Sequence, residues 1–273
     1  MTRIVTLTTD FGTRDYYAAG VKGAILRECP DAVIVDVTHD LEPFDLREAS
    51  FTLWQAAPCF PEGTVHAAVV FPETGVEDVV AVRAGGHSLV GPDNGVLSMA
   101  AVSLGIEEIR LVKDISRPSS CKTFDGRFLV APAAGRLASG GSMSALGPEV
   151  EGIRELEIPR ATVSPELTRG EILHVDRFGN LVTSLRAEDL PAGWGKRLSL
   201  RAMGREWKVR LAACFAEGDP GEMLLVKGSV GLIEISCNRA SAAAASGLGV
   251  GDGITIAKAG RGRGGGSSER FGR

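Results

Sequence analysis

In the stretch Ile4-Val5-Thr6-Leu7-Thr8-Thr9-Asp10-Phe11-Gly12-Thr13-Arg14-Asp15, a short apolar run leads into two aspartates around a glycine turn. Residues 4–8 are rich in β-branched side chains and predict a buried strand. Asp10 and Asp15 then lie at its carboxyl end, and Asp15 can also cap the amphipathic stretch that follows. Ligands bind at this edge of an open α/β sheet, where a carboxylate can accept hydrogen bonds from a ribose diol. The spacing is equally compatible with Asp10 as a simple turn cap.

The next residues alternate between helical and strand patterns. Residues 15–28 and 45–57 place apolar or small side chains at helical spacing, whereas residues 32–37 and 64–70 are further β-branched runs. Strand, helix, strand, helix, strand in this order predicts parallel strands joined by crossover helices.

Two more strands are expected at residues 79–83 and 88–90, around the glycine turn at 85–86. A dense turn signal follows in Gly91-Pro92-Asp93-Asn94-Gly95. Residues 128–138 predict a short helix, provided that Pro132 lies in its first turn.

The composition changes near residues 158–168, and short strand-like runs separated by turn residues follow. These runs are residues 171–175, 181–185, 198–202, 206–211, 223–227, 231–236 and 254–257. They predict a small antiparallel β-barrel domain. Gly247-Leu248-Gly249-Val250-Gly251 follows an alanine-rich helical stretch and not a strand, so a helix cap and turn is expected there and not a nucleotide loop.

The fold class is therefore α/β, with two domains and a tail. We expect an α/β nucleoside-binding domain with a parallel sheet over residues 1–160 and a β-barrel domain over residues 168–258. The glycine- and arginine-rich tail at 259–273 is expected to be disordered. RNA binding by its arginines is the alternative to an inert terminus.

The bulk composition indicates a soluble globular protein. The 273 residues are 44% hydrophobic with a formal net charge of −4, which gives no electrostatic footprint for nucleic acid or an anionic membrane. No apolar run reaches the roughly eighteen residues that span a bilayer. The five cysteines contain no CxxC pair and predict reduced, mostly buried thiols in a cytoplasmic protein. The four histidines are not spaced as zinc ligands, so neither a metal nor a cofactor is expected.

Several motifs in order carry a resemblance to a known family. They are Thr9-Asp10-Phe11-Gly12 with Asp15, Val35-Asp36-Val37-Thr38-His39-Asp40, Phe60-Pro61-Glu62-Gly63-Thr64-Val65, Gly91-Pro92-Asp93-Asn94-Gly95, Asp176-Arg177-Phe178-Gly179-Asn180, and Gly228-Ser229 through Asn238. This set resembles the S-adenosylmethionine (SAM)-dependent fluorinases and chlorinases and their relatives, the SAM hydrolases (hydroxide adenosyltransferases). The resemblance implies a homotrimer with active sites between neighbouring subunits. It also implies displacement at the 5′ carbon of SAM by a small nucleophile, with methionine as the leaving group.

The resemblance also implies roles for individual residues. Asp10 matches the carboxylate that holds the ribose hydroxyls, and Asp15, Phe44, Phe124 and Asn238 belong to the same substrate site. Phe178 and Phe215 match aromatics that enclose the adenine, and Asn180 matches the amide at its edge. Asp176 and Ser229 match groups that hold the methionine ammonium and carboxylate. From the local sequence alone, core packing for the phenylalanines and a turn role for Asp176 remain open.

The chain departs from the hydrolases where they carry an Asp, Arg, His set thought to activate water. Phe71, Asp78 and Asp125 stand at those places. Phe71-Pro72-Glu73-Thr74-Gly75 instead resembles a halogenase segment, with Thr74 matching the halogenase threonine. Gly126 replaces the fluorinase's halide-binding serine, a position that is glycine in the chlorinase.

Two nucleophiles are therefore open. Phe44, Phe71, Thr74, Phe124 and Gly126 could line an apolar pocket that fits a halide. Asp125 argues for water, because a carboxylate beside a buried halide is a like-charge pair, whereas a carboxylate can orient and deprotonate water. We expect water, with Asp125 and Asp78 in place of the missing His and Arg.

Chloride is the alternative nucleophile, and a catalytically silent SAM or adenosine binder is a second alternative. Asp78 and Asp125 can also be interpreted as solvent-exposed turn aspartates, in which case neither takes part in the reaction.

Overall fold

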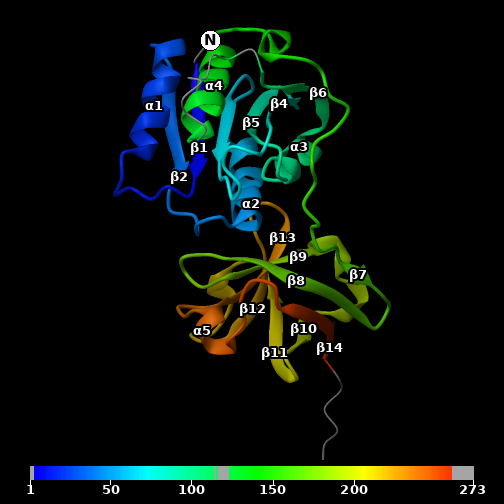
Figure 1. The fold of residues 1–273 in the computed structure, drawn as a ribbon. Helices are drawn as coiled ribbons and strands as arrows, with labels where there is room; N and C mark the ends of the chain where they lie inside the picture. Colours follow the sequence, from blue (N-terminus) through cyan, green and yellow to red (C-terminus); the bar gives the residue numbers. More distant parts are fainter. Residues whose placement is uncertain (1–2, 114, 116–122, 260–273) are drawn as a thin grey trace, which may run out of the picture. The chain divides into compact units, whose positions relative to one another are not determined.

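The computed structural model describes residues 3–113, 115 and 123–259, and it divides into two compact units. Unit 1 is Met1–Glu157 and unit 2 is Ile158–Arg273. Figure 1 shows a mixed α/β unit 1 and a β-rich unit 2, and the predicted fold class is confirmed. The tail predicted to be disordered lies outside the described residues from 260 onward.

Unit 1 is built on a six-stranded sheet with strand order β2-β1-β3-β5-β4-β6. The strands are β1 (Ile4–Thr9), β2 (Val33–Thr38), β3 (Val65–Val69), β4 (Val79–Ala84), β5 (His87–Pro92) and β6 (Ile106–Leu111). β1 lies parallel between β2 and β3, and β5 is parallel to β3. The predicted crossover order is therefore confirmed, while β4 and β6 add an antiparallel edge.

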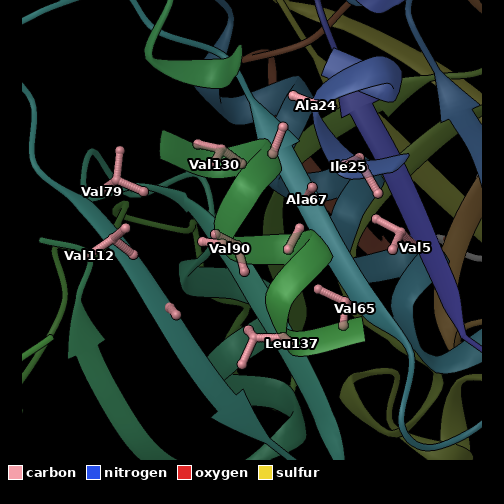
Figure 2. Close-up of a cluster of buried hydrophobic side chains, with 14 of the residues drawn as sticks. Val5, Ala24, Ile25, Val65, Ala67, Val79, Val90, Val112, Val130 and Leu137 are labelled. Atoms are coloured by element: carbon pink, nitrogen blue, oxygen red, sulfur yellow. The ribbon is translucent and has the colours of Figure 1, made fainter. Parts of the chain in front are cut away.

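Helices cover both faces of this sheet. They are α1 (Tyr17–Glu28), α2 (Leu46–Ala56), α3 (Ser98–Leu104) and α4 (Ala131–Ala138). Alternate residues of β3 divide between two cores: Val65 and Ala67 pack with α1 and α4, whereas Ala68 packs with α2 and α3. Figure 2 shows the first core, in which Ala24 and Ile25 of α1 face the strands. Successive side chains of a strand point to opposite faces of the sheet. Because helices cover both faces at β3, all of its residues are buried, which explains its continuous apolar run.

The helix boundaries correct one prediction. Asp15 does not cap α1, because Tyr16 occupies the N-cap position and makes no side-chain cap bond. Asp45 does cap α2, by accepting a hydrogen bond from the Glu48 amide at 2.9 Å. Asp15 and Asp45 precede similar apolar patterns in the sequence. They differ in the local backbone, which places Asp45 but not Asp15 at an N-cap position.

The helix predicted at 128–138 is two elements. A π-helix, η2 (Gly126–Val130), continues directly into α4. Pro132 lies in the first turn of α4, as the sequence required. α3 and β6 were not predicted from the sequence.

Unit 2 is a closed seven-stranded barrel with one added short strand. The strands are β7 (Thr162–Val163), β8 (Leu167–Val175), β9 (Leu181–Arg186), β10 (Arg197–Ala202), β11 (Arg205–Ala212), β12 (Met223–Lys227), β13 (Leu232–Cys237) and β14 (Gly253–Lys258). Pairing of β14 with β8 closes the barrel, and β7 pairs only with β8. All pairs are antiparallel except β11 with β12. The predicted barrel is confirmed with this one parallel exception.

The helix α5 (Ala242–Ser246) ends on Gly247, whose φ of 76° is left-handed. The glycine-rich segment after it is therefore a helix cap and turn, as predicted.

The cysteines only partly match the prediction of mostly buried thiols. Cys29 and Cys237 are buried, Cys59 and Cys214 are exposed, and all four are free. Cys121 lies outside the described residues. Within the described part of the chain, no helix has the length and apolar character needed to cross a bilayer.

Candidate active site

A cavity of about 670 Å³ opens in unit 1 beside the carboxyl ends of β1 and β3. It brings together seven of the residues predicted from the sequence, namely Asp10, Phe44, Phe71, Thr74, Phe124, Asp125 and Gly126. The other residues lining it are Phe11, Tyr16, Tyr17, Pro43, Val69, Thr123, Arg127 and Phe128. Most of the wall is aromatic or aliphatic, with a small number of polar groups placed on it.

Asp10 follows β1 and faces the loop that leads into α2. Its Oδ2 accepts a hydrogen bond from the Phe44 amide at 3.0 Å. Phe44 has a left-handed φ of 69°, and the residue is 63% exposed. The contact fixes the loop against the strand end, so Asp10 does cap a turn while it also lines the cavity.

Asp125 stands at the N-cap position of η2 and is only 1% exposed. Its Oδ2 accepts a hydrogen bond from the Gly75 amide at 3.0 Å, which ties the segment carrying Phe71 and Thr74 to the start of η2. The alternative of an exposed turn aspartate is therefore wrong for Asp125. A buried carboxylate on a largely apolar cavity wall is a site for proton transfer or for a cationic ligand.

The wall next to Asp125 leaves no room for a side chain at Gly126. A Cβ there would lie 2.3 Å from the Val69 Cγ1 atom. Atoms cannot approach so closely, so Val69 would have to move before residue 126 could carry a hydroxyl group. This part of the cavity therefore offers a valine methyl group and backbone.

An aromatic cluster forms one side of the cavity around Phe124. Its ring meets those of Phe11 and Tyr17 edge to face, at centroid distances of 5.9 and 5.1 Å. Tyr16 stacks on Tyr17 at 4.8 Å. The cavity positions of Phe11, Tyr16 and Tyr17 were not predicted, although three aromatics within seven residues after a strand are a usable signal.

Two predicted acidic residues do not reach this cavity. Asp15 and Asp78 are both exposed, and neither is among the described residues that line it. The described part of the chain also holds no group of three or more His, Cys, Asp or Glu residues placed to bind a metal ion.

The remaining predicted residues lie in unit 2. Asp176 organises a tight turn: its Oδ1 accepts the amides of Phe178 and Asn180, both at 2.9 Å. Its Oδ2 accepts the Asn180 side-chain amide at 2.8 Å. Asp176 therefore has the turn role that the sequence left open, with Asn180 held beside it.

The two predicted adenine-binding phenylalanines are on the surface of unit 2. Phe178 is 78% exposed and Phe215 is 43% exposed, which excludes core packing for both. Ser229 is exposed as well. Glu234 was not predicted from the sequence. Burial raises the pKa of the Glu234 carboxyl group, and the electrostatic repulsion from Asp176 raises it further.

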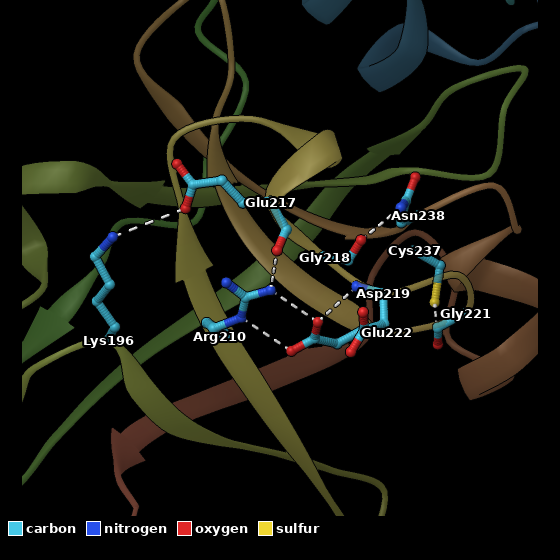
Figure 3. Close-up of polar contacts among 9 residues, drawn as sticks. All are labelled: Lys196, Arg210, Glu217, Gly218, Asp219, Gly221, Glu222, Cys237 and Asn238. Carbon is cyan, nitrogen blue, oxygen red and sulfur yellow. Dashed lines mark hydrogen bonds and ion pairs between the residues drawn. The ribbon is translucent and has the colours of Figure 1, made fainter.

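A polar network holds the turn that carries Phe215 (Figure 3). Arg210 donates from Nε and Nη2 to the two carboxylate oxygens of Glu222 at 3.0 and 2.8 Å, and it also donates to the Glu217 carbonyl. Asn238 donates to the Gly218 carbonyl at 2.6 Å. The guanidinium hydrogen bonds lower the pKa of Glu222 to about 2. Asn238 therefore fixes the Phe215 turn in addition to any contact with a ligand.

We predict that Arg210→Ala loosens this turn without unfolding the barrel. The amides of Phe215–Glu217 should exchange with deuterium about tenfold faster. In the wild type, local opening of the turn must break the guanidinium contacts of Arg210, and the variant lacks these contacts. Lys208→Ala, on the same strand with an exposed side chain, is the matched control. Unchanged exchange in Arg210→Ala would show that the network does not hold the turn.

Comparisons with known proteins agree with this architecture. The model of the SAM hydroxide adenosyltransferase N-terminal domain matches residues 5–147, and that of the C-terminal domain matches residues 170–255. A relative from Thermus thermophilus named (R)-S-adenosyl-L-methionine hydrolase is 37% identical over 250 residues, covering 88% of this chain and 94% of the relative.

More distant relatives and a solved structure add to this. A fluorinase from Actinopolyspora mzabensis is 29% identical over 273 residues, covering 87% of this chain and 91% of the fluorinase. A crystal structure described as an uncharacterized conserved protein from Thermotoga maritima has a TM-score of 0.87 and 31% identity, covering 93% of this chain and 99% of the other. The resemblance found in the sequence is thus confirmed in both halves, and the chain belongs to the SAM hydroxide adenosyltransferase family.

Proposed function

We propose that this protein hydrolyses SAM to adenosine and L-methionine. The family and the hydrolase relatives support this substrate and reaction. The observation that carries the choice of water is Asp125, a carboxylate that is 1% exposed on the cavity wall. No further cofactor is part of the proposal.

In the proposed step, the water oxygen forms a bond to C5′ while the C5′–S bond breaks. The bonding electron pair stays on sulfur, so the sulfonium becomes the neutral thioether of methionine. One water proton passes to the carboxylate of Asp125, and the water oxygen becomes the 5′-hydroxyl of adenosine. Because the sulfonium is already a good leaving group, positioning and exclusion of bulk water do most of the work.

Other residues are assigned to binding. Asp10 holds the ribose hydroxyls, and Phe44, Phe71, Thr74, Phe124 and Gly126 line the space for the nucleophile. In unit 2, Phe178, Phe215 and Asn180 bind the adenine, and Asp176 and Ser229 bind the methionine ammonium and carboxylate. Asn238 belongs to the same substrate site. The exposed rings of Phe178 and Phe215 are consistent with contact to a planar ligand. The exposure of Asp15 and Asp78 gives their proposed roles no support.

Chloride is the second candidate nucleophile. The apolar cavity wall and the 29% identical fluorinase favour a halide. Against it stands the buried Asp125, because an ionised carboxylate and a halide beside it form a like-charge pair. The crowding of Gly126 by Val69 leaves no space for the halide-binding hydroxyl of the fluorinases, but it does not count against chloride, because the position is glycine in the chlorinase.

Product analysis separates these candidates. The protein is incubated with SAM in chloride-free buffer and in high chloride, and the nucleosides are separated by chromatography. We expect adenosine with equimolar methionine in both buffers. 5′-Chloro-5′-deoxyadenosine as the main product would show that chloride, and not water, is the nucleophile. Tight binding of SAM by calorimetry without any product would show that the protein is a silent binder.

We further propose a homotrimer, as the family resemblance implies, and a location in the cytoplasm, as the cysteine usage indicates. Light scattering on the purified protein should give three times the chain mass of 28.6 kDa. A monomer mass would contradict the trimer.

A further inference from the structure

A single buried histidine holds both ends of the turn that carries Asp10. His39 directly follows β2 and is only 7% exposed. Its Nδ1 lies 2.8 Å from the hydroxyl oxygen of Thr9, the residue before Asp10. Its backbone carbonyl accepts a hydrogen bond at 2.6 Å from the amide of Gly12, two residues after Asp10. The turn of residues 9–12 is therefore fastened on both sides of Asp10 to one residue at the end of the neighbouring strand.

The backbone of β2 is irregular immediately before this histidine. Its pairing with β1 passes from Asp36 to Thr38 over one step of β1, so Val37 is an extra residue on β2. An extra residue of this kind bends its strand and changes the direction of the side chains that follow. The bend therefore helps to set the direction in which His39 leaves the strand.

The group on the far side of the ring indicates where the protons lie. Nε2 of His39 is 3.1 Å from Oδ1 of Asp36, and Oδ2 of Asp36 accepts a hydrogen bond from Lys22 of α1 at 2.6 Å. The negative carboxylate favours a proton on Nε2, which leaves Nδ1 as an acceptor in the neutral ring. The Thr9 hydroxyl then donates to Nδ1, while its oxygen accepts the Phe11 amide at 3.4 Å. A chain of polar contacts thus runs from α1 to the backbone of the turn.

This chain ends beside the carboxylate that the proposed function assigns to the ribose hydroxyls. Asp10 and Phe11 of the turn both line the cavity, and Oδ2 of Asp10 also accepts the Phe44 amide. We infer that His39 is a positioning residue, which acts through Thr9 to fix the Asp10 carboxylate in the direction that binds a ribose diol. The inference rests on the proposed function.

The position of His39 separates this role from direct binding. It is not among the described residues that line the cavity, so its effect on a ligand has to pass through the turn. A carboxylate that accepts two hydroxyl donors at once needs both of its oxygens in the right place. A small displacement of Asp10 therefore weakens the binding of a nucleoside with both hydroxyls more than that of a nucleoside without them.

Calorimetry with adenosine and with 2′,3′-dideoxyadenosine tests this difference. Neither compound carries the sulfonium, so neither reacts during the measurement. His39→Ala should weaken adenosine binding about fivefold to fiftyfold and 2′,3′-dideoxyadenosine binding less than twofold. Thr9→Val has nearly the same shape and removes the same contact from its other side, so it should show the same selective loss. His39→Asn should recover part of the loss, because its side-chain oxygen can replace Nδ1 as the acceptor.

A second arm asks whether the effect passes through Asp10. In an Asp10→Ala background, His39→Ala should change adenosine binding less than twofold further, because no carboxylate is left to position. Thr38→Val is the matched control: it removes the acceptor of the Asp40 amide, a 3.0 Å hydrogen bond in the same loop, and should leave both dissociation constants within twofold.

Two results would overturn the inference. One is an equal loss on the two nucleosides in His39→Ala and Thr9→Val, which is also what a general folding defect produces. The other is the same loss from His39→Ala with and without Asp10.

Turnover of SAM by the same proteins separates this inference from the proposed function. A wild type that binds adenosine but converts no SAM contradicts the hydrolase function, and the binding arms still decide the role of His39. A wild type that hydrolyses SAM, with His39→Ala and Thr9→Val binding adenosine as tightly as it does, leaves the function standing and refutes the positioning role. A wild type that does not bind adenosine refutes the positioning role as well.

Discussion

Asp125→Asn should slow the hydrolysis of SAM about a hundredfold to ten-thousandfold, the usual range for losing a general base. Asparagine has nearly the same volume, and its carbonyl oxygen can still accept the Gly75 amide bond that Asp125 makes at 3.0 Å. The segment carrying Phe71 and Thr74 should therefore stay in place. What disappears is the charge that takes the water proton.

Kinetics and binding together isolate this effect. The first-order rate of adenosine formation at saturating SAM should fall by the stated factor, whereas the dissociation constant from calorimetry should change less than about tenfold. Asp40→Asn, an exposed aspartate outside the described cavity lining, is the matched control. A hydrolysis rate that Asp125→Asn leaves unchanged would remove Asp125 from the mechanism.

The second large effect concerns acid stability and comes from two buried histidines. His66 on β3 is fully buried, with its Nδ1 2.8 Å from the Thr6 hydroxyl and its Nε2 3.1 Å from Nδ1 of His87. Burial lowers the pKa of His66 to about 3, assisted by the nearby His87. Burial lowers the pKa of His87 as well. Both rings are therefore neutral in the folded protein at pH 7.

The sign of the pH dependence follows from that shift. The pKa of His66 falls from 6.5 in the unfolded chain to about 3 in the fold, so the unfolded chain binds more protons between these values. The stabilisation is complete above about pH 6.5 and is lost progressively as the pH falls toward 3. At pH 4.5 the loss from His66 amounts to about 2 to 3 kcal/mol of unfolding free energy.

Urea unfolding at pH 7.5 and pH 4.5 measures this loss. His66→Gln should reduce the pH dependence by that amount, since glutamine can take a hydrogen bond without titrating. His174→Gln on β8 is the control, because it removes a histidine but leaves the buried pair of His66 and His87 intact. An identical pH dependence in wild type and His66→Gln would show that His66 does not cause the acid sensitivity.

The sequence predicted the scaffold of the site well because its signals are local. β-branched runs and crossover spacing located β1, β2 and β3, and with them the sheet edge at which Asp10 lies. Strand runs with turn residues located the barrel in the same way. Closure of the barrel through β14 and β8 depends on pairing between distant segments, which no local pattern encodes.

The details that failed are those decided by tertiary packing. Asp15 follows the cap pattern as well as Asp45 does, but the backbone at Tyr16 is already helical. Asp125 is buried and accepts a hydrogen bond from the Gly75 amide, fifty positions away in the chain, and no local pattern encodes such a contact. The position of Arg127 in the cavity lining was not predicted either, because an arginine in a turn-like run is usually solvated.

Hydrolysis in water enriched in ¹⁸O tests the central claim most directly. The protein is incubated with SAM in labelled water and high chloride, and the adenosine formed is analysed by mass spectrometry. Attack of water at C5′ predicts one ¹⁸O atom in the 5′-hydroxyl of every adenosine formed and unlabelled methionine. Adenosine without the label, or a chlorinated nucleoside in its place, would contradict the account.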